Sequence, residues 1–578
     1  MSAWFERDPA RLDREVAAWR EHGFTLNQDA FRDGFVRFVG AVTYDHLSYG
    51  VRVDYPQGFP YQRPEVFLPD VTPTSEDRHR TLVDGLLCLR GYLPDEWDSE
   101  DLGVDLLPDL DTWLHGHFTG EWENEHRAAD LSFLPRIGFR SILVGPEFQR
   151  RLDTPHGRLP AFEYVHGNNH VIHVTTSRPV FEGALQRSDD SIAYVRLQQA
   201  PLALGRLFRQ SETGGLAPAD VLTTLDHELA GTRATLEGYL RVHRRWREGT
   251  IVCLQFPLPG EDEPRWVWEA LVLHPQRGLL PVQVNYGSDL FNRVRNELDT
   301  ATLKDARALI LGQGSIGAPV AIDLARAGVG NLTLLDVDFI AIGNLTRHPA
   351  SIRHLGMPKT LAVRDLILER IPGASITPGI NGNPITNLYH HYDELRTLAA
   401  DHDVVAVCVG NDNLHQYLNE ILLQEHARAV YAWVYVDAAA GRVVRVLPDS
   451  TGCMRCLNLW IAENPERYGI TPRIPKDINK LPLDYGCNTP AVPGSGFDTT
   501  RIALAQTRMV LQLLLGDQAA YPYDDADHRL LINRPLTAIP GSDFETSGSW
   551  KLEPHPECKV GHSAMKIERM FVQQFLAR

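Results

Sequence analysis

The spacing of hydrophobic residues predicts two helices and three strands in the first 130 residues. Apolar side chains recur at helical spacing across residues 9–22 and again across Leu106–Phe118, and each pattern predicts an amphipathic helix. Between them, runs of β-forming residues predict the strands Phe35–Val42, His46–Tyr55 and Glu65–Leu68. This order of elements predicts a compact α+β domain at residues 1–130.

The next segment, residues 131–285, carries no motif with recognisable chemistry. A long helical pattern runs from Ala217 to about Glu248, and strand-like runs follow at 251–257 and 266–273. Cys253 lies inside the apolar run TIVCLQF, so we expect it in a hydrophobic core. We predict a linker or docking domain here.

From residue 286 onward, strand patterns and helix patterns alternate. The runs ARALILG, NLTLLDVD and DVVAVCVG predict buried strands, and APVAIDLARAG and PKTLAVRDLILERI predict helices between them. Such alternation is typical of a parallel sheet with crossover helices. The expected fold class is therefore a multi-domain α/β and α+β protein with a Rossmann-like domain at residues 286–578. Cys408, inside the third strand pattern, is expected in the core.

Composition narrows the function classes. The chain has 578 residues, too many for one core, and its formal charge of −17 argues against general binding to nucleic acid or anionic membranes. No stretch approaches the ~18 apolar residues of a spanning helix, and the first residues lack a signal-peptide pattern. The seven cysteines are too sparse for a disulfide framework. We expect a cytoplasmic protein with reduced thiols.

A glycine cluster lies between the first strand and helix of the Rossmann-like region. Gly312, Gly314 and Gly317 in GQGSIG would let the backbone approach phosphates at a helix N-terminus. Asp336 ends the second strand 19 residues after Gly317, where a carboxylate accepts from a ribose hydroxyl. These residues together predict a nucleotide-binding site. The glycines alone would also be compatible with a dinucleotide-dependent oxidoreductase.

The polar residues after the second strand favour triphosphate chemistry. Asn344 and Arg347 follow it, and Lys359 comes twelve residues after Arg347. Two cations near a phosphate site suit a triphosphate better than hydride transfer. Asp412, in GNDN after the third strand, is a candidate ligand for Mg²⁺.

The segment GQGSIGAPVAIDLARAGVGNLTLLDVDFIAIGNLTRH, with GMPK after it, resembles the ThiF/MoeB family and the ubiquitin-activating enzymes. The resemblance covers roughly half of the chain and implies ATP and Mg²⁺. It implies these roles: Gly312, Gly314 and Gly317 line the nucleotide, Asp336 binds its ribose, Asn344, Arg347 and Lys359 bind its phosphates, and Asp412 positions magnesium. Arg293, in FNRVRN, resembles the family arginine that reaches into the partner subunit's site, which implies a homodimer.

Three cysteines of this region match the structural zinc site of the same family. Cys453 and Cys456 form a CxxC, a spacing that lets two thiolates reach one metal. Cys558 matches one cysteine of the family's second pair, but Gly561 stands at the place of the other. The resemblance implies zinc on Cys453, Cys456, Cys558 and His562, with His555 as a further candidate for the fourth ligand. The alternative is a site that packs without metal.

Cys487 lies in the polar loop DYGCNTPAVPGSG. A loop cysteine beside a helix is a nucleophile where its thiolate is favoured. In ubiquitin-activating relatives this region carries the cysteine that forms the thioester, so the resemblance implies that role for Cys487. A structural role is the alternative.

The first domain resembles ubiquitin-conjugating enzymes. FPYQRPEV at 59–66 and DGLLCL at 84–89 match that family's proline segment and active-site turn, and Trp97 lies near its tryptophan. The resemblance implies that Cys88 accepts the acyl group. The family's His-Pro-Asn is missing, and the segment EDRHRT, with His79 and Arg80, stands in its place. The sequence therefore lacks the family's asparagine, which stabilises the oxyanion when a lysine attacks in the last transfer.

An activating and a conjugating domain in one chain resemble the bacterial bifunctional proteins of CBASS antiphage systems. The resemblance implies activation of a protein C-terminus, a thioester on Cys487, transfer to Cys88 and conjugation to a target lysine. The activated partner is then the CD-NTase of such a system or a separate ubiquitin-like protein. A sulfur-carrier adenylyltransferase and a non-catalytic scaffold are the alternatives.

Overall fold

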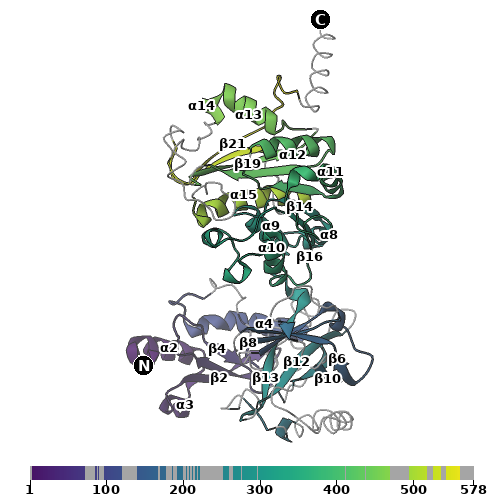
Figure 1. Ribbon diagram of the computed structural model, residues 1–578. Helices are drawn as coiled ribbons and strands as arrows, with labels where there is room; N and C mark the ends of the chain where they lie inside the picture. The colour runs from purple at the N-terminus through teal and green to yellow at the C-terminus, as the bar shows by residue number, and fades with distance from the viewer. Residues whose placement is uncertain are drawn as a thin grey trace. The chain divides into compact units, whose positions relative to one another are not determined.

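The computed structural model forms two compact units (Figure 1). The N-terminal unit comprises residues 1–178 and 182–288, and the C-terminal unit comprises residues 179–181 and 289–578. The structure describes residues 3–71, 85–87, 89, 97–119, 140–166, 169–176, 185–186, 192–198, 204, 207, 211, 215–217, 219–221, 251–258, 264–274, 276–295, 297–410, 412–435, 438–448, 450–468, 494–516, 525–535 and 542–559. The division into domains at 1–130, 131–285 and 286–578 stays a prediction.

The first sheet has four antiparallel strands in chain order. Its strands are β1 (Thr25–Leu26), β2 (Val36–Tyr44), β3 (Leu47–Tyr55) and β4 (Glu65–Phe67), and its helices are α1 (Trp4–Arg7), α2 (Pro9–Glu21), α3 (Gln28–Arg32) and α4 (Leu107–Thr119). The helices and strands predicted here are confirmed within two residues. Trp19, Phe38 and Trp113, almost fully buried, form the centre of the core.

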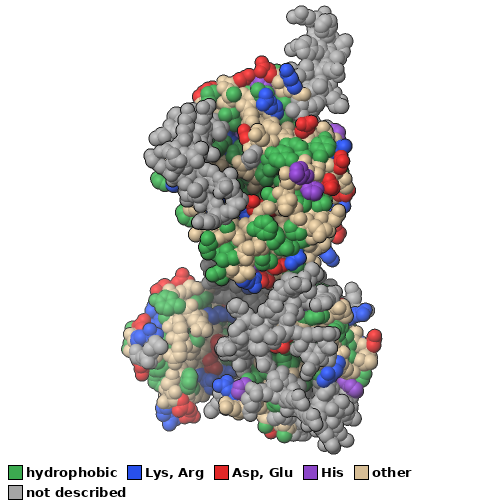
Figure 2. Space-filling view, viewed as in Figure 1, with side chains coloured by type: hydrophobic (Ala, Val, Ile, Leu, Met, Phe, Trp, Pro, Cys, Tyr) green, Lys and Arg blue, Asp and Glu red, His purple; other side chains and the backbone are tan. Residues whose placement is uncertain are grey.

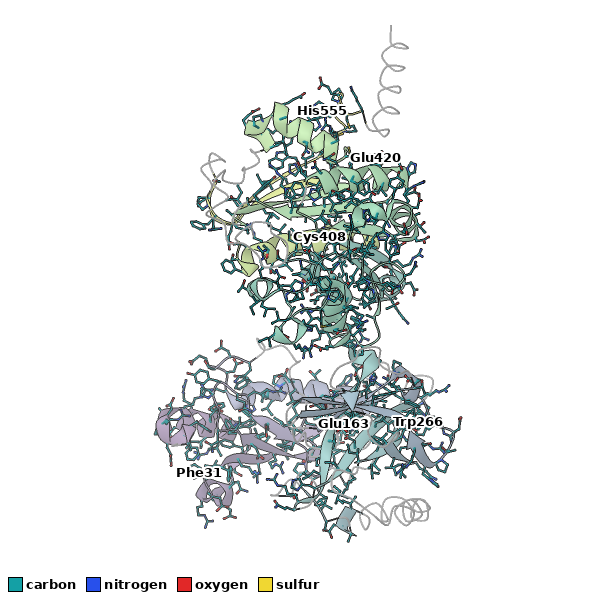
Figure 3. All side chains as sticks on the ribbon, viewed as in Figure 1. Phe31, Glu163, Trp266, Cys408, Glu420 and His555 are labelled. Carbon is teal, nitrogen blue, oxygen red and sulfur yellow. The ribbon has the colours of Figure 1, made fainter. Side chains whose placement is uncertain are left out.

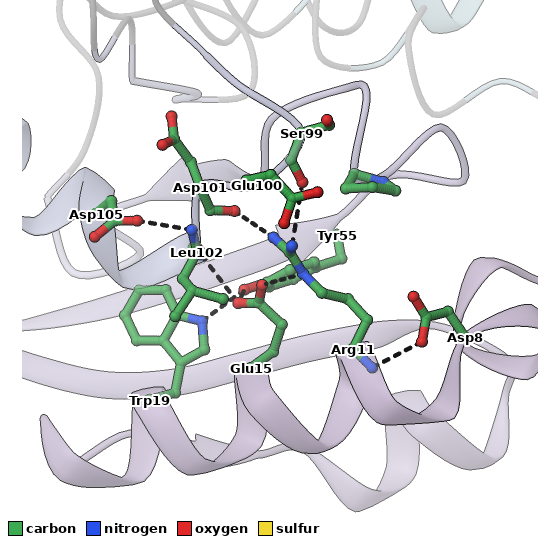
Figure 4. A network of polar contacts seen from close by, with 12 residues as sticks. Asp8, Arg11, Glu15, Trp19, Tyr55, Ser99, Glu100, Asp101, Leu102 and Asp105 are labelled. Carbon is green, nitrogen blue, oxygen red and sulfur yellow. Dashed lines mark hydrogen bonds and ion pairs between the residues drawn. The ribbon is translucent and has the colours of Figure 1, made fainter.

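A buried polar network fixes α2 to the segment before α4 (Figure 4). The guanidinium of Arg11 lies 3.0 Å from the carboxylate of Glu15. The same carboxylate accepts hydrogen bonds from Tyr55 and from the backbone N–H of Gly103, the latter at 2.9 Å. Burial raises the pKa of Glu15 above its usual value, although these partners act in the opposite direction. Removing one partner would leave a buried group unpaired, so the network holds this loop in one position.

The second sheet has nine strands in the order β6-β10-β11-β12-β13-β5-β8-β7-β9. The strands are β5 (Arg140–Val144), β6 (His156–Leu159), β7 (Ala161–His166), β8 (Asn169–Val174), β9 (Leu185–Gln186), β10 (Ile192–Arg196), β11 (Ile251–Leu258), β12 (Arg265–His274) and β13 (Gly278–Tyr286). Both predicted strands, at 251–257 and 266–273, are confirmed as β11 and β12. Cys253 is buried in the core as predicted, and burial raises the pKa of its thiol to about 12. Most of the predicted long helix, from residue 222 to its expected end near Glu248, lies outside the described residues.

The third sheet, in the C-terminal unit, has eight strands in the order β16-β15-β14-β17-β18-β19-β20-β21. Strands β16, β15, β14, β17 and β18 are parallel to one another. Each of β19, β20 and β21 pairs antiparallel with the strand before it in this order. The strands are β14 (Arg307–Leu311), β15 (Asn331–Leu335), β16 (Ser375–Pro378), β17 (Val404–Val407), β18 (Ala429–Val434), β19 (Ala440–Val446), β20 (His528–Ile532) and β21 (Thr546–Trp550). The helices are α8 (Thr300–Asp305), α9 (Gly317–Ala327), α10 (Lys359–Leu368), α11 (Tyr392–Asp401), α12 (Asp412–Gln424), α13 (Met454–Glu463), α14 (Pro465–Tyr468) and α15 (Gly496–Leu515).

Helices cover both faces of this sheet (Figure 1). Side chains of the central strands alternate between two cores: Ala308 and Ile310 of β14 pack with α9, α10 and α15, whereas Leu309 and Leu311 pack with α11, α12 and α13. A strand buried on both faces explains why ARALILG is apolar without alternation. The predicted βαβαβ unit with a parallel sheet is confirmed.

The strand order places a crevice at one edge of the central strands. The chain passes from β14 to β15 and β16 on one side, and then returns to β17 on the other side of β14. In open parallel sheets, ligands bind at the carboxyl ends of strands where the order reverses in this way.

None of the helices in the described part of the chain is long and apolar enough to cross a membrane. Figure 2 shows Lys and Arg interspersed with Asp and Glu over the described surface that faces the viewer.

Candidate functional site

A cavity of about 220 Å³ lies at the carboxyl ends of β14, β17 and β18. It is lined by residues from three loop segments, the start of α10 and the end of β18: Gly314, Ser315, Ile316, Asn344, Arg347, His348, Lys359, Cys408, Val409, Gly410, Trp433 and Val434. Four of the sequence-predicted site residues, Gly314, Asn344, Arg347 and Lys359, therefore share one cavity. Its position agrees with the switch point of the sheet.

The three glycines of GQGSIG meet different steric demands. Gly312 has a φ of +92°, and a Cβ there would lie 2.7 Å from the carbonyl oxygen of Cys408. A Cβ on Gly317 would lie 1.8 Å from the carbonyl oxygen of Gly312, so these two glycines are required by close backbone packing. Gly314 is different, because no atom lies within 4 Å of the place its Cβ would take. The open space beside Gly314 fits a phosphate group that approaches the backbone.

The N-terminus of α9 adds a favourable field to this space. In the described part of the chain, the backbone N–H groups of Gly314, Ser315 and Ile316 donate to no other backbone group. Such unpaired donors and the positive end of a helix dipole favour an anion. The loop therefore has the steric and electrostatic properties of a phosphate site.

Asp336 lies directly after β15 and is bonded to the glycine loop. Its carboxylate accepts from the backbone N–H of Gln313 and from that of Asp338, the latter at 2.8 Å. Burial raises the pKa of Asp336, while the nearby Lys359 and these donors act to lower it. A carboxylate has about four acceptor sites, so capacity remains for a ribose hydroxyl.

Lys359 is paired with a carboxylate that the sequence analysis overlooked. Its Nζ lies 2.8 Å from Oδ2 of Asp338, and its side chain is 12% exposed. The signal was present in the sequence, because Asp338 follows Asp336 in LLDVD. Lys359 therefore lines the cavity with its charge already partly neutralised.

Arg347 lies in the loop that follows a short 3₁₀ segment, Ile342–Thr346. Asn344 stabilises this segment, because its side-chain oxygen accepts from the backbone N–H of Ala341 at 2.9 Å. Gly496, the first residue of α15, packs against the same loop: a Cβ there would lie 3.2 Å from Cα of Arg347. The start of α15 is thus tied to the arginine loop.

Asp412 is the first residue of α12 and its side chain is 78% exposed. It is not among the described residues that line the cavity, although Gly410, two residues earlier, is one of them. Its Oδ1 lies 3.9 Å from Nδ1 of His415. The role of Asp412 toward magnesium stays a prediction.

Cys408 was expected in the core, and it is partly buried and packs against the core formed with α9 and α15. β17 ends at Val407, so Cys408 lies just after the strand and also lines the cavity. Figure 3 labels Cys408 within the C-terminal unit. Its thiol donates to the side chain of Gln506 at 3.1 Å, and burial raises its pKa to about 12. Where a strand ends depends on its pairing partners, which an apolar run alone does not reveal. Trp433 and His348 also line the cavity without having been predicted.

Comparison with known proteins identifies this region. Residues 287–535 match the model of the ThiF family. The C-terminal unit carries a ThiF/MoeB-like adenylation domain. Molybdopterin-synthase adenylyltransferase of Escherichia coli is 37% identical over 28% of this chain and 62% of that protein. Ubiquitin-like modifier-activating enzyme 5 of Caenorhabditis elegans is 25% identical over 27% of this chain and 38% of that protein.

One relative matches nearly the whole chain. The uncharacterized protein y4oA of Sinorhizobium fredii is 24% identical over 97% of this chain and 98% of its own length. Among solved structures, E. coli MccB with MccA-N7isoASN is 22% identical with a TM-score of 0.34, over 45% of this chain and 68% of that chain. A TM-score of this size supports no argument. The ubiquitin-conjugating resemblance of residues 1–130 and the CBASS association stay predictions.

Arg293 lies in an exposed turn of the C-terminal unit and does not line the cavity of its own chain. The family resemblance assigned it to a partner subunit's site, and that role and the homodimer stay predictions.

Three cysteines of the adenylation domain form a buried cluster. Sγ of Cys453 lies 3.8 Å from Sγ of Cys456 and 3.9 Å from Sγ of Cys558. All three sulfur atoms lie within 4.8 Å of one another, which suits three ligands of a single tetrahedral metal. The neighbouring thiols of Cys456 and Cys558, together with burial, raise the pKa of Cys453 far above its usual value.

Of the two candidates for a fourth ligand, only His555 is described. His562 is not among the described residues. His555 is engaged elsewhere: its Nε2 lies 3.1 Å from a carboxylate oxygen of Glu463, and its ring packs against Trp460. Zinc at this site stays a prediction.

Cys88 and Cys487, the two predicted nucleophiles, lie outside the described residues, as do His79 and Arg80. The residues around Cys88 are well anchored: the backbone N–H of Leu87 donates to Val66 at 2.9 Å, and Leu87 and Leu89 are both buried. Trp97 donates its indole N–H to the carbonyl of Pro60 at 2.8 Å.

Proposed function

We propose that this protein activates the C-terminal carboxylate of another protein with ATP and Mg²⁺, and then transfers the acyl group through two cysteines to an amine. The observation that carries the proposal is the cavity that joins the Gly314 loop, Asn344, Arg347 and Lys359 at the switch point of a ThiF/MoeB-like domain. Open space beside Gly314, unpaired N–H donors and two cations suit a polyphosphate.

In the first step a carboxylate oxygen of the donor attacks the α-phosphorus of ATP. The bond to the bridging oxygen breaks, and pyrophosphate leaves with the electron pair. Arg347 and Lys359 stabilise the negative charge of the phosphates. Lys359 does so in exchange for its contact with Asp338. Bound Mg²⁺ would neutralise phosphate oxygens, and Asp412 is the residue that would hold it.

In the second step the thiolate of Cys487 attacks the acyl carbon, and AMP leaves. Support comes from the connection of the Cys487 segment to α15, whose first residue packs against the loop of Arg347. The thiolate of Cys88 then attacks the thioester and releases Cys487. Finally the amine of a target lysine attacks and releases the Cys88 thiol, so that ATP is consumed only once.

The cysteine cluster supports a structural zinc ion. Cys453, Cys456 and Cys558 would hold it together with His562, because three buried thiols fit the donor set of such sites. The ion would join α13 to the C-terminal segment and stabilise the domain.

For the partner, we propose the CD-NTase of a CBASS antiviral system, with a separate ubiquitin-like protein as the alternative donor. Arg293 of a second copy would complete the nucleotide site in a homodimer. A sulfur-carrier adenylyltransferase is the second candidate function, because the molybdopterin-synthase relative is 37% identical over the matched region. That enzyme class needs neither Cys88 nor a domain at residues 1–130.

Pyrophosphate exchange and thioester trapping test these functions. The full chain should exchange labelled pyrophosphate into ATP in the presence of the donor protein, and form adducts that dithiothreitol removes. Cys487→Ala should abolish every adduct, Cys88→Ala should leave one adduct on Cys487, and Cys253→Ala should retain both. Exchange without any adduct would support the sulfur-carrier function instead, and a chain without exchange would refute adenylation.

A further inference from the structure

His348, in the loop of Arg347, contacts the glycine loop through one ring nitrogen and its own loop through the other. Nε2 lies 2.8 Å from the carbonyl oxygen of Gln313, inside the glycine loop. Nδ1 accepts the backbone N–H of Ala350 at 3.0 Å, in the arginine loop. The residue is 6% exposed and lines the cavity.

The donor and acceptor roles define the protonation state. Because Nδ1 accepts, the ring proton lies on Nε2 and is donated to Gln313. Burial lowers the pKa of His348 to about 4, and the positive charges of Lys359 and His354 act in the same direction. The imidazole is therefore neutral near pH 7 and keeps this arrangement.

The peptide group after Gln313 is the one that carries the N–H of Gly314. In a trans peptide the C=O and N–H point in opposite directions, so a bond that fixes the carbonyl of Gln313 also fixes the direction of the Gly314 N–H. The N–H of Gln313 is held separately by Asp336, and its side-chain amide donates to the carbonyl of Ile310 at 3.0 Å. His348 therefore orients the peptide group between Gln313 and Gly314, and not the one before it. Gly314 has no side chain that would restrict the direction of this peptide group.

We propose that His348 is a positioning residue of the nucleotide site, which holds the Gly314 N–H in the direction required by the phosphates. It does not touch the reacting atoms. The inference rests on the proposed adenylation function, since it assigns the bound anion to a nucleotide phosphate. It also couples the glycine loop to the loop of Arg347, so that the two halves of the phosphate site keep a fixed spacing.

Three variants of His348 in the full chain test the role. His348→Gln keeps a donor and an acceptor at similar reach, whereas His348→Leu removes both and His348→Asn is too short to bridge the two loops. His402→Leu is the matched control, because its half-buried imidazole likewise joins two elements, through Leu398 of α11 and Thr333 of β15, away from the cavity. The readouts are KM for ATP and kcat in pyrophosphate exchange, and ATP binding by calorimetry.

We expect KM and the dissociation constant for ATP to rise about tenfold in His348→Leu and His348→Asn, which is the loss of one hydrogen bond. His348→Gln should restore both within threefold, and His402→Leu should keep KM within twofold even where its stability falls. A merely structural role would lower the active fraction, and thus the apparent kcat, without changing KM.

Unchanged ATP affinity in His348→Asn and His348→Leu would overturn the inference while adenylation stands. If His348→Leu fails to fold, His348→Asn and its rescue by glutamine decide. A wild-type chain that binds no ATP refutes the proposed function itself, and this inference with it.

Discussion

The contrast between Gly314 and Gly317 allows a sharp test of how the glycine loop works. Alanine at position 317 would place a Cβ 1.8 Å from a backbone oxygen and 3.0 Å from Cβ of Cys408. Backbone cannot move aside as a side-chain end does, so we expect a loss of about 2 kcal/mol or more in unfolding free energy. Alanine at position 314 meets no atom within 4 Å, so its effect on unfolding should stay within ~0.5 kcal/mol.

The order of effects reverses when nucleotide is added. The methyl group of Gly314→Ala would occupy the space that a phosphate needs, and we expect ATP to bind at least tenfold more weakly. At a fixed, saturating ATP concentration a tenfold weaker complex loses about 1.4 kcal/mol of ligand-induced stabilisation. For a unit of this size, the ATP-induced rise in melting temperature should be smaller by about 2 °C.

Thermal unfolding of both variants, with and without Mg²⁺-ATP, separates the two effects. Gly317→Ala should melt about 3 °C or more below wild type without nucleotide. Without nucleotide, Gly314→Ala should have the same melting temperature as wild type. With nucleotide, its melting temperature should be lower than that of wild type. Equal destabilisation of both variants without ATP would falsify the steric argument, and an undiminished ATP shift in Gly314→Ala would show that no phosphate lies there.

Three further predictions address charge, pH and metal. Asp338→Asn releases Lys359 from its carboxylate, so ATP should bind a few-fold more tightly by calorimetry; weaker binding would mean that Asp338 positions the lysine instead. The pKa of His348 is about 4 in the folded chain and near 6.5 in the unfolded chain. The free energy of unfolding should therefore be highest above pH 6.5 and fall by about 3 kcal/mol in total as the pH decreases toward 4. His348→Gln should flatten that part of the stability profile, and an identical profile would count against burial of a neutral ring. Cys453→Ser should lower bound zinc, measured by metal analysis, from one per chain to none, and a metal-free wild-type chain would contradict the zinc site.

Much of the fold was predictable because its signals are local. A strand buried on both faces reads as a short apolar run, and the helix of residues 317–327 ends at Gly328, whose φ is +108°. The glycines and Asp336 were found through their spacing around a strand and a helix. These patterns depend on neighbours in the sequence, which is why the boundaries of the described elements agree within three residues.

The contacts that complete the site were not predictable in the same way. Lys359 meets Asp338 across 21 residues, and His348 meets Gln313 across 35. Neither pair follows a fixed spacing, because each depends on how loops at the ends of different strands come together. Cys408 was expected inside the third strand for the same reason, since only the pairing of β17 with its neighbours shows that the strand ends at Val407.

The pairing of Lys359 with Asp338 has a consequence for selectivity. A tethered carboxylate 2.8 Å from the ammonium acts as a permanent competitor with a high effective concentration. A single-charged anion that displaces it gains little, because it exchanges one charge pair for another. A polyanion displaces it at one oxygen while its other oxygens bind Arg347 and the helix N-terminus. Lys359 thus carries its own counter-ion, and a cavity built in this way would discriminate against simple anions before any substrate arrives.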